Sequence, residues 1–412
     1  MFQYDNGVKV LFIHNDNSEV VSVKVFTRVG AIDEKPSQAG LSHFIEHLMF
    51  KGSKNFIGDS FSRNVENMGG YINAETSKDY TAYYVNIHKD GAKKIIKMLA
   101  DTVSNPLFNA PDIDRERKVV IEEIQRHLDN PFSTLGDMFF ENIYKESAMK
   151  NSIIGTQEII AGVSRDEIYD YYQTHYAAGK MLVVVCGNFD EAQIKPIIDE
   201  SFGKFEKKEI PHEPPLKESL HKGNDLTKNA KVENGYMISG FIGPDSLSQD
   251  FYAAGLSAEI LAGGNSSRLY KVLKEEKKLV YEIDCAFYAM KGNGLFYMDA
   301  VFDEKNISQI KEEMQNQIAD IINKGASDEE LNRAKISLKT SWNFSAEIPS
   351  KTASMFGYWT LMERKDLIDN YLSKIESVNK QSIKDFFAKY GAKDLITNIA
   401  LVPIRSSANN NT

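Results

Sequence analysis

Residues 39–49 read AGLSHFIEHLM and contain two histidines four residues apart, His43 and His47. Because an α-helix advances about 100° per residue, the two imidazoles project from one helix face, one turn apart. Two imidazoles placed in this way can bind a single Zn²⁺ ion. Glu46 lies within the same turn and can reach a metal-bound water without being a ligand. The order of these residues is the inverted form of the HExxH zinc-protease motif, so the stretch predicts a metal site on a helix.

The residues that flank this motif are apolar, which distinguishes it from a solvated helix surface. A surface helix can carry two histidines and a glutamate without any function, but the neighbours here are Phe44, Ile45, Leu48, Met49 and Phe50. Histidines buried among such side chains need polar partners, and a metal ion supplies them. The flanking sequence therefore favours the metal site.

A third protein ligand is expected, because a catalytic zinc ion typically has three protein ligands and a water. A long helix is predicted over 111–130, and it contains the stretch ERKVVIEEI at 116–124. Glu116 and Glu123 are two turns apart and share a helix face, whereas Glu122 points about 100° away from Glu123. Glutamates at this spacing usually form a solvated face. The residues alone therefore leave the third ligand open between a carboxylate, another histidine and a cysteine.

Strand-like and helical stretches alternate along the chain in two halves of similar length, which predicts an α+β fold with a mixed sheet and helices on one side in each half. The tetrapeptide AGLS at 39–42 recurs at 254–257, each time in a predicted helix, and this favours a duplicated unit. A further helix is predicted over 134–144, in the first half. We expect four segments: an N-terminal catalytic zinc-binding domain over 1–208, a polar linker with prolines over 209–228, a C-terminal domain over 229–405 and a disordered tail over 406–412.

The composition is that of a globular protein, and its charge excludes some partners. The net charge of -9 argues against a nucleic-acid or anionic-membrane binder, which needs clustered positive charge. Cys186 and Cys285 are too few for a disulfide-rich scaffold or a cysteine-based zinc finger. No apolar run approaches the roughly 18 residues of a membrane span, and the start lacks the features of a signal peptide. A cytoplasmic protein is expected by default, although a mature exported chain with a new starting methionine would look the same.

HFIEH followed about 75 residues later by ERKVVIEEI resembles the pitrilysin/insulysin-type zinc peptidases, which are inverzincins. The likeness is greatest to their half-length members, such as the β subunit of the mitochondrial processing peptidase and its bacterial relatives. The resemblance implies that Glu123 completes a metal site with His43 and His47, holding one Zn²⁺ per chain. It also implies that Glu116 supports the ligands and catalysis.

The resemblance extends to two substrate-binding regions. The segment 70–81, GYINAETSKDYT, is similar to the one that forms the family's edge strand for substrate backbone, which implies Asn73 and Ala74 as substrate contacts. In its C-terminal half the family places an arginine and, seven residues later, a tyrosine near the zinc. Lys274 and Tyr281 stand there in this chain, which implies a catalytic and substrate-binding role for both. Lysine keeps the charge but loses the bidentate fork of arginine, so Lys274 is either a working substitute or a plain surface lysine.

The family fold is a clam-like chamber of four α+β domains, so a chain that supplies two of them is expected to dimerise. The partner is a second copy or a related half-length chain that supplies the arginine and tyrosine. The resemblance implies a zinc-dependent endopeptidase that hydrolyses unstructured peptides bound in extended form, with Glu46 as general base. Two alternatives are an active subunit that works only in a heterodimer, and a non-catalytic structural subunit, which usually loses the zinc motif that this chain keeps.

Overall fold

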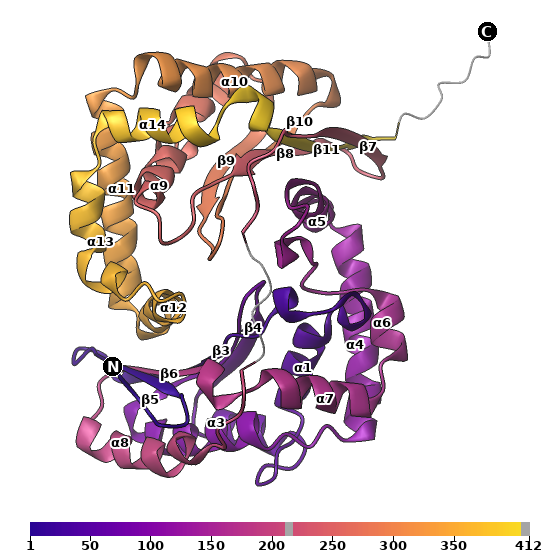
Figure 1. Cartoon of the computed structure of the whole chain (residues 1–412), viewed down its shortest axis with the longest axis vertical. Helices are drawn as coiled ribbons and strands as arrows, with labels where there is room; N and C mark the ends of the chain where they lie inside the picture. Colours follow the sequence, from indigo (N-terminus) through magenta and orange to yellow (C-terminus); the bar gives the residue numbers. More distant parts are fainter. Residues whose placement is uncertain (211–216, 405–412) are drawn as a thin grey trace. The chain divides into compact units, whose positions relative to one another are not determined.

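The computed structural model describes residues 1–210 and 217–404, and it divides the chain into two compact units (Figure 1). Unit 1 consists of three segments: Met1–Arg126, Asn151–Pro214 and Phe344–Lys365. Unit 2 consists of the other three: His127–Lys150, Pro215–Asn343 and Asp366–Thr412. The tail predicted over 406–412 and the middle of the predicted linker lie outside the described residues.

Unit 1 contains a six-stranded mixed sheet in the order β1-β2-β6-β3-β5-β4. Its strands are β1 (Phe2–Gln3), β2 (Lys9–His14), β3 (Val20–Thr27), β4 (Tyr71–Thr76), β5 (Thr81–His88) and β6 (Met181–Gly187). Strands β2 and β6 are parallel, and the other neighbours are antiparallel. The central strands β3 and β6 are rich in valine and almost entirely buried, as expected for β-branched residues on a covered sheet. Strand β4 forms one edge of the sheet.

Helices of unit 1 share one hydrophobic core with one face of this sheet. They are α1 (Leu41–Met49), α2 (Ser60–Asn67), α3 (Ala92–Ser104), α4 (Ala110–Asp129), α6 (Gln157–Gly162), α7 (Arg165–His175) and α8 (Glu191–Glu200). Val21, Val23 and Val25 of β3 point into the hydrophobic core that these helices share with the sheet. Among the described residues, no helix is both long and apolar enough to cross a membrane.

Unit 2 repeats this architecture. Its strands are β7 (Asp225–Ala230), β8 (Gly235–Ile242), β9 (Val280–Tyr288), β10 (Leu295–Phe302) and β11 (Thr397–Pro403). Its helices include α9 (Asp250–Ala262), the π-helix η7 (Tyr270–Glu276), α10 (Ile307–Lys324), α11 (Asp328–Glu347), α13 (Asp366–Ser377) and α14 (Lys380–Tyr390). The order β7-β11-β8-β10-β9 matches β2-β6-β3-β5-β4 of unit 1, and the parallel pair occupies the same place in both sheets. The predicted α+β fold with a duplicated unit is therefore confirmed.

The two units exchange one helix each. Helix α5 (Pro131–Ile143) follows α4 in sequence but packs on β8 and β11 of unit 2, and α12 (Pro349–Leu361) follows α11 but packs on β3 and β6 of unit 1 (Figure 1). In unit 1 the exchanged helix covers the second face of the sheet, because it contacts Lys24 and Phe26, which alternate along β3 with the core valines. The predicted domains 1–208 and 229–405 are contiguous and contain no such exchange.

Two local features differ from the sequence-based expectation. Strand β7 begins at Asp225, within the stretch assigned to a linker. The first AGLS tetrapeptide lies only partly inside a helix, because α1 begins at Leu41 and Gly40 is its N-cap, with a left-handed φ of 90°. The second AGLS lies wholly within α9.

Candidate metal centre

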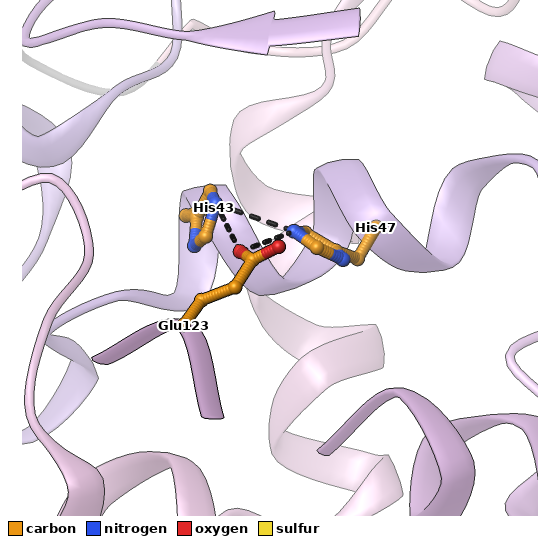
Figure 2. A group of neighbouring side chains, drawn as sticks. All are labelled: His43, His47 and Glu123. Carbon is orange, nitrogen blue, oxygen red and sulfur yellow. Dashed lines mark hydrogen bonds and ion pairs between the residues drawn. The ribbon is translucent and has the colours of Figure 1, made fainter. Parts of the chain in front are cut away.

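Three side chains from two helices meet on one side of α1. His43 and His47 project from α1, and Glu123 reaches them from α4 (Figure 2). The Nε2 atoms of the two histidines lie 3.3 Å apart. The Oε2 atom of Glu123 lies 3.3 Å from His47 Nε2 and 3.7 Å from His43 Nε2. Within the described residues, these three side chains form the group of histidine, cysteine or acidic residues whose potential ligand atoms lie close enough together to hold one metal ion.

The size and chemistry of this triangle fit a zinc ion. Zinc–nitrogen and zinc–oxygen bonds of about 2.0–2.2 Å in a tetrahedron place neighbouring ligand atoms roughly 3.3–3.6 Å apart. The three observed separations lie close to this range. Two imidazoles and one carboxylate form a ligand set found in catalytic zinc sites, where the fourth position is open to water or substrate. The residues present therefore fit Zn²⁺.

Glu116 contacts His47 through the ring nitrogen that does not face Glu123. Its side chain is 5% exposed and lies on the core face of α4 with Ile113 and Val120. Its Oε2 atom lies 3.5 Å from His47 Nδ1, and its Oε1 atom lies 2.9 Å from Lys51 Nζ. Burial acts to raise the pKa of Glu116, but the hydrogen bonds from His47 and Lys51 together bring it below its ordinary value. A carboxylate on Nδ1 fixes the ring so that Nε2 faces the ion, which is the usual role of such a partner.

Glu46 interacts electrostatically with His47 and Glu123 of the cluster and contacts the edge strand. The hydroxyl of Thr76, the last residue of β4, donates a hydrogen bond to Glu46 Oε2 at 3.0 Å. Burial raises the pKa of Glu46, and the nearby His47 opposes that rise. A carboxyl with a raised pKa accepts and releases a proton more readily near neutral pH, which suits a general base.

The structure also separates the two adjacent glutamates of α4. Glu122 is exposed, whereas Glu123 is partly buried at the cluster. Arg126, one turn further along α4, places Nη2 3.6 Å from the other carboxylate oxygen of Glu123.

Lys51 and Thr76 were not predicted from the sequence. Lys51 lies four residues after His47, a spacing that could have indicated it, whereas nothing local to Thr76 indicates contact with Glu46.

Asn73 and Ala74 lie on β4, which pairs with β5 and forms the edge of the sheet. Asn73 is exposed, and its Oδ1 atom accepts a hydrogen bond from its neighbour's amide at 2.9 Å. Glu75, which follows Ala74 on β4, forms an ion pair with Lys24 of β3, with 2.8 Å between Glu75 Oε1 and Lys24 Nζ. The two predicted substrate contacts are therefore on an edge strand whose last residue touches Glu46.

Lys274 and Tyr281 belong to unit 2, whereas the ligands belong to unit 1. Lys274 lies in the π-helix η7, with its Nζ atom 5.0 Å from the centre of the Tyr270 ring. Tyr281 lies at the start of β9 and is 55% exposed. Their predicted roles at the metal site stay predictions.

Comparisons with known proteins agree with the geometry. Residues 9–157 match the family described as insulinase (peptidase family M16), and residues 162–338 match the peptidase M16 inactive domain. The chain is 26% identical over 406 residues to an uncharacterized zinc protease of Bacillus subtilis, YmxG, covering 98% of this chain and 97% of the relative. All three side chains of the metal cluster lie within the first of the two matched regions.

Two solved structures have the same fold. A protease from Helicobacter pylori superposes with a TM-score of 0.91 at 22% identity, covering 98% of both chains. The periplasmic protease PqqL from Escherichia coli superposes with a TM-score of 0.79 at 18% identity, covering 98% of this chain but 47% of that one. Because the two family matches together span residues 9–157 and 162–338, the chain belongs to peptidase family M16, the pitrilysin-type zinc peptidases, as a half-length member.

Proposed function

We propose that this protein is a zinc-dependent endopeptidase that hydrolyses unstructured peptides bound in extended form. The proposal rests mainly on one observation: two imidazole nitrogens and one carboxylate oxygen form a triangle that fits zinc, with Glu46 beside it on the same helix. Zn²⁺ bound there would act as a Lewis acid, lowering the pKa of a water molecule and polarising the peptide carbonyl.

The chain's own residues have distinct roles in this reaction. Glu46 takes a proton from the attacking water and then delivers it to the leaving amine, as a general base followed by a general acid. Glu116 keeps His47 oriented through Nδ1. The hydroxyl of Thr76 holds the Glu46 carboxylate next to the end of β4. Lys274 and Tyr281 are the proposed donors to substrate from unit 2.

Strand β4 is the proposed docking site for the substrate. It is an edge strand, and such a strand can pair with an extended peptide through backbone hydrogen bonds. Pairing at Asn73 and Ala74 would bring the peptide close to Thr76 and Glu46. Because backbone pairing reads little sequence, we expect broad specificity.

Metal analysis of the purified protein combined with peptide cleavage tests this function. We expect about one zinc per chain, cleavage of an unstructured peptide, and loss of cleavage with a chelator that is reversed by adding zinc. Cleavage that persists in the metal-free protein would contradict the proposal.

We also propose that the active form is a dimer with an enclosed chamber. Support comes from the half-length of the chain, which spans 47% of PqqL. A homodimer is the simpler form. Lys274, where the family has arginine, favours the alternative of a heterodimer with a related half-length chain. A mass from size-exclusion chromatography that matches two copies, together with activity of the purified chain alone, would support the homodimer. A chain that cleaves peptides only after a related chain is added would support the heterodimer.

A further inference from the structure

The helix that carries the metal ligands cannot cap its own N-terminus. Its N-cap is Gly40, whose φ of 90° disfavours other residues and whose side has no room. A Cβ atom at this position would lie 2.7 Å from the carbonyl oxygen of Ile154. The serine, threonine or aspartate that usually caps a helix is therefore excluded, and the first amides of α1 need another acceptor.

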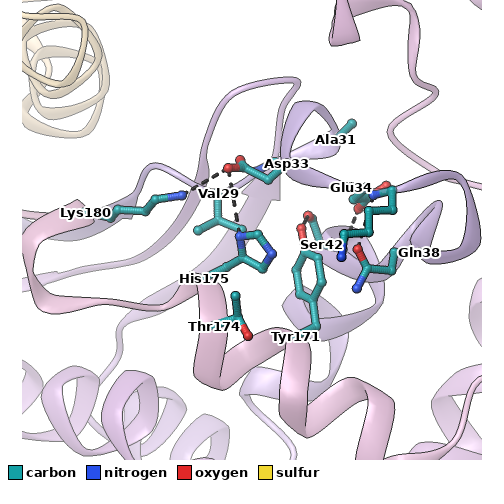
Figure 3. A network of polar contacts seen from close by, with 12 residues as sticks. Val29, Ala31, Asp33, Glu34, Gln38, Ser42, Tyr171, Thr174, His175 and Lys180 are labelled. Atoms are coloured by element: carbon teal, nitrogen blue, oxygen red, sulfur yellow. Dashed lines mark hydrogen bonds and ion pairs between the residues drawn. The ribbon is translucent and has the colours of Figure 1, made fainter. Parts of the chain in front are cut away.

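Glu34 supplies that acceptor from a separate segment (Figure 3). It directly follows the short helix η1 (Ala31–Asp33), and its side chain is buried, with 6% exposure. Its Oε2 atom accepts a hydrogen bond from the amide of Gly40, and its Oε1 atom accepts one from the amide of Ser42, both at 2.7 Å. A carboxylate at a helix N-terminus is also stabilised by the helix dipole. Burial acts to raise the pKa of Glu34, whereas the two amide hydrogen bonds favour the ionised carboxylate and oppose that rise.

The segment that carries Glu34 is itself fixed to the sheet. Asp33 binds Lys180 Nζ, just before β6, at 3.0 Å and accepts the amide of Gly30 at 3.0 Å. Asn151 donates to the carbonyl oxygens of Ala31 and Glu34. Figure 3 shows Asp33 and Glu34 pointing to opposite sides, one toward Lys180 and the other toward α1. Glu34 therefore connects the start of α1 to a segment that is hydrogen-bonded to Lys180 and Asn151.

A second contact fixes the same turn. Ser42 and Tyr171 of α7 are both buried, and their hydroxyl oxygens lie 2.8 Å apart. Ser42 directly precedes the proposed ligand His43, which lies in the first turn of α1, where an uncapped helix frays. His47 lies one turn further along. A loose first turn would therefore move His43 relative to His47 and open the triangle of ligand atoms.

We propose that Glu34, assisted by the Tyr171 hydroxyl, is a positioning residue that holds the first turn of α1 so that His43 faces the zinc ion. The inference rests on the proposed metal site. In Glu34→Gln, an amide group replaces one acceptor oxygen and places a donor against a backbone N–H. Outer partners of metal ligands typically change metal affinity about 10–100-fold, and we expect about a tenfold weaker zinc affinity for this variant.

A glutamate in unit 2 provides the matched control. Glu218 is 3% exposed, and its Oε2 atom accepts the amides of Lys145, Glu146 and Ser147 at 2.9–3.1 Å. Glu218→Gln makes the same change at a similarly buried carboxylate that belongs to unit 2, whereas α1 belongs to unit 1. Both variants should lower the melting temperature of the metal-free protein, and we expect only Glu34→Gln to change zinc binding.

The experiment measures zinc dissociation constants by competition with a chromophoric chelator, and the visible absorption of the Co²⁺-substituted proteins. We expect a weaker zinc affinity and an altered Co²⁺ spectrum in Glu34→Gln, with Glu218→Gln like the wild type in both. Wild-type affinity and spectrum in folded Glu34→Gln would overturn the positioning role. If Glu34→Gln does not fold, Tyr171→Phe becomes the test, and an unchanged zinc affinity in it would overturn the role. Absence of zinc binding in the wild type would instead refute the proposed function.

Discussion

Units 1 and 2 build the same sheet, but they differ at the positions where unit 1 gathers its metal cluster. The AGLS tetrapeptide that both units share aligns α1 with α9, and the proline that follows each helix aligns α4 with α11. On α9, the positions equivalent to His43, Glu46 and His47 hold Ala258, Leu261 and Ala262. On α11, those equivalent to Glu116 and Glu123 hold Ala334 and Ser341, so all five positions of unit 2 hold small or apolar residues. The three α9 residues are buried. Ala334 is buried as well, whereas Ser341 is exposed. Unit 2 therefore packs small or apolar side chains at four of the five positions, and the proposed metal site is carried by five polar side chains on two helices of unit 1.

The exchanged helices also dock in opposite ways. Phe139 of α5, eight residues after the proline that begins the helix, packs over Gly240 of β8, where a Cβ atom would lie 2.9 Å from the ring. The residue eight positions after the proline of α12 is Gly357, and the ring that it meets is Phe26 of β3. In unit 2 the helix supplies the aromatic ring and the strand supplies the glycine, whereas in unit 1 the strand supplies the ring and the helix supplies the glycine. The same close approach is thus reached by two different side-chain arrangements.

The largest expected effect comes from removing the general base in unit 1. Glu46→Gln should lower kcat/KM for an unstructured peptide by about 10³-fold, because proton transfer by a positioned carboxylate contributes about 10²–10⁴-fold. Zinc content should stay at the wild-type level, because Glu46 is not among the three ligand atoms. Peptide cleavage assays and metal analysis measure the two quantities. Glu259→Gln on α9 is the control in unit 2, and retained turnover in Glu46→Gln would exclude this residue as the base.

The next effect separates the adjacent glutamates of α4. Glu123→Gln should weaken zinc binding by about 100-fold, because it removes an anionic ligand, and this lies at the upper end of the 10–100-fold range typical of outer partners. Glu122→Gln should have wild-type affinity, because its side chain is exposed. Zinc remaining after dialysis against a chelator measures both variants. Equal metal content in the two would contradict the choice of Glu123 as ligand.

A third pair of variants compares the exchanged helices. In Gly357→Ala the new Cβ atom would lie 2.3 Å from Phe26, and such overpacking costs about 1–3 kcal/mol. Gly136→Ala in α5 meets no heavy atom within 4 Å and should stabilise the helix by about 0.5–1 kcal/mol. Urea unfolding measures both free energies. If the two variants change stability alike, the close contact of α12 with β3 does not contribute as described.

The smallest expected effect is a difference between the two units in how the free energy of unfolding changes with pH. Burial lowers the pKa of His175 in unit 1 to about 4 and raises that of Asp299 in unit 2 to about 6. On acidification from pH 7 to 5, unfolded histidine gains a proton that folded His175 does not, so this one group lowers the stability of unit 1, while burial of Glu34 acts in the opposite direction there. Folded Asp299 gains a proton before its unfolded form does, so unit 2 gains stability. Each change should amount to about 1–2 kcal/mol.

Amide hydrogen exchange, corrected for its intrinsic pH dependence, can follow the two units separately. We expect His175 to lower protection in unit 1 and Asp299 to raise it in unit 2 over this range. His175→Gln should remove the first change and Asp299→Asn the second. Parallel changes in both units would show that other groups dominate their acid response.

Helical periodicity was sufficient to place His43, Glu46 and His47 on one short helix, because residues three and four apart meet within a turn regardless of the rest of the fold. It also predicted α4 and α5 as helices, to within about three residues. Periodicity could not choose between Glu122 and Glu123, since both lie on the same helix and the choice depends on which face turns toward α1. The resemblance to the zinc peptidases made that choice, and the structure brings Glu123 to the cluster.

The sequence by itself determined the local elements, the α+β class, the duplicated pattern and the two histidines of the metal cluster, because these depend on neighbours close along the chain. Only the tertiary structure decided that α5 and α12 exchange units, that Glu123 joins the cluster, and that Glu34 caps α1. Each of these joins segments distant in sequence. An apolar stripe shows that a helix must be covered, but it does not specify which sheet covers it, and a buried carboxylate does not reveal its amide partners before the chain folds.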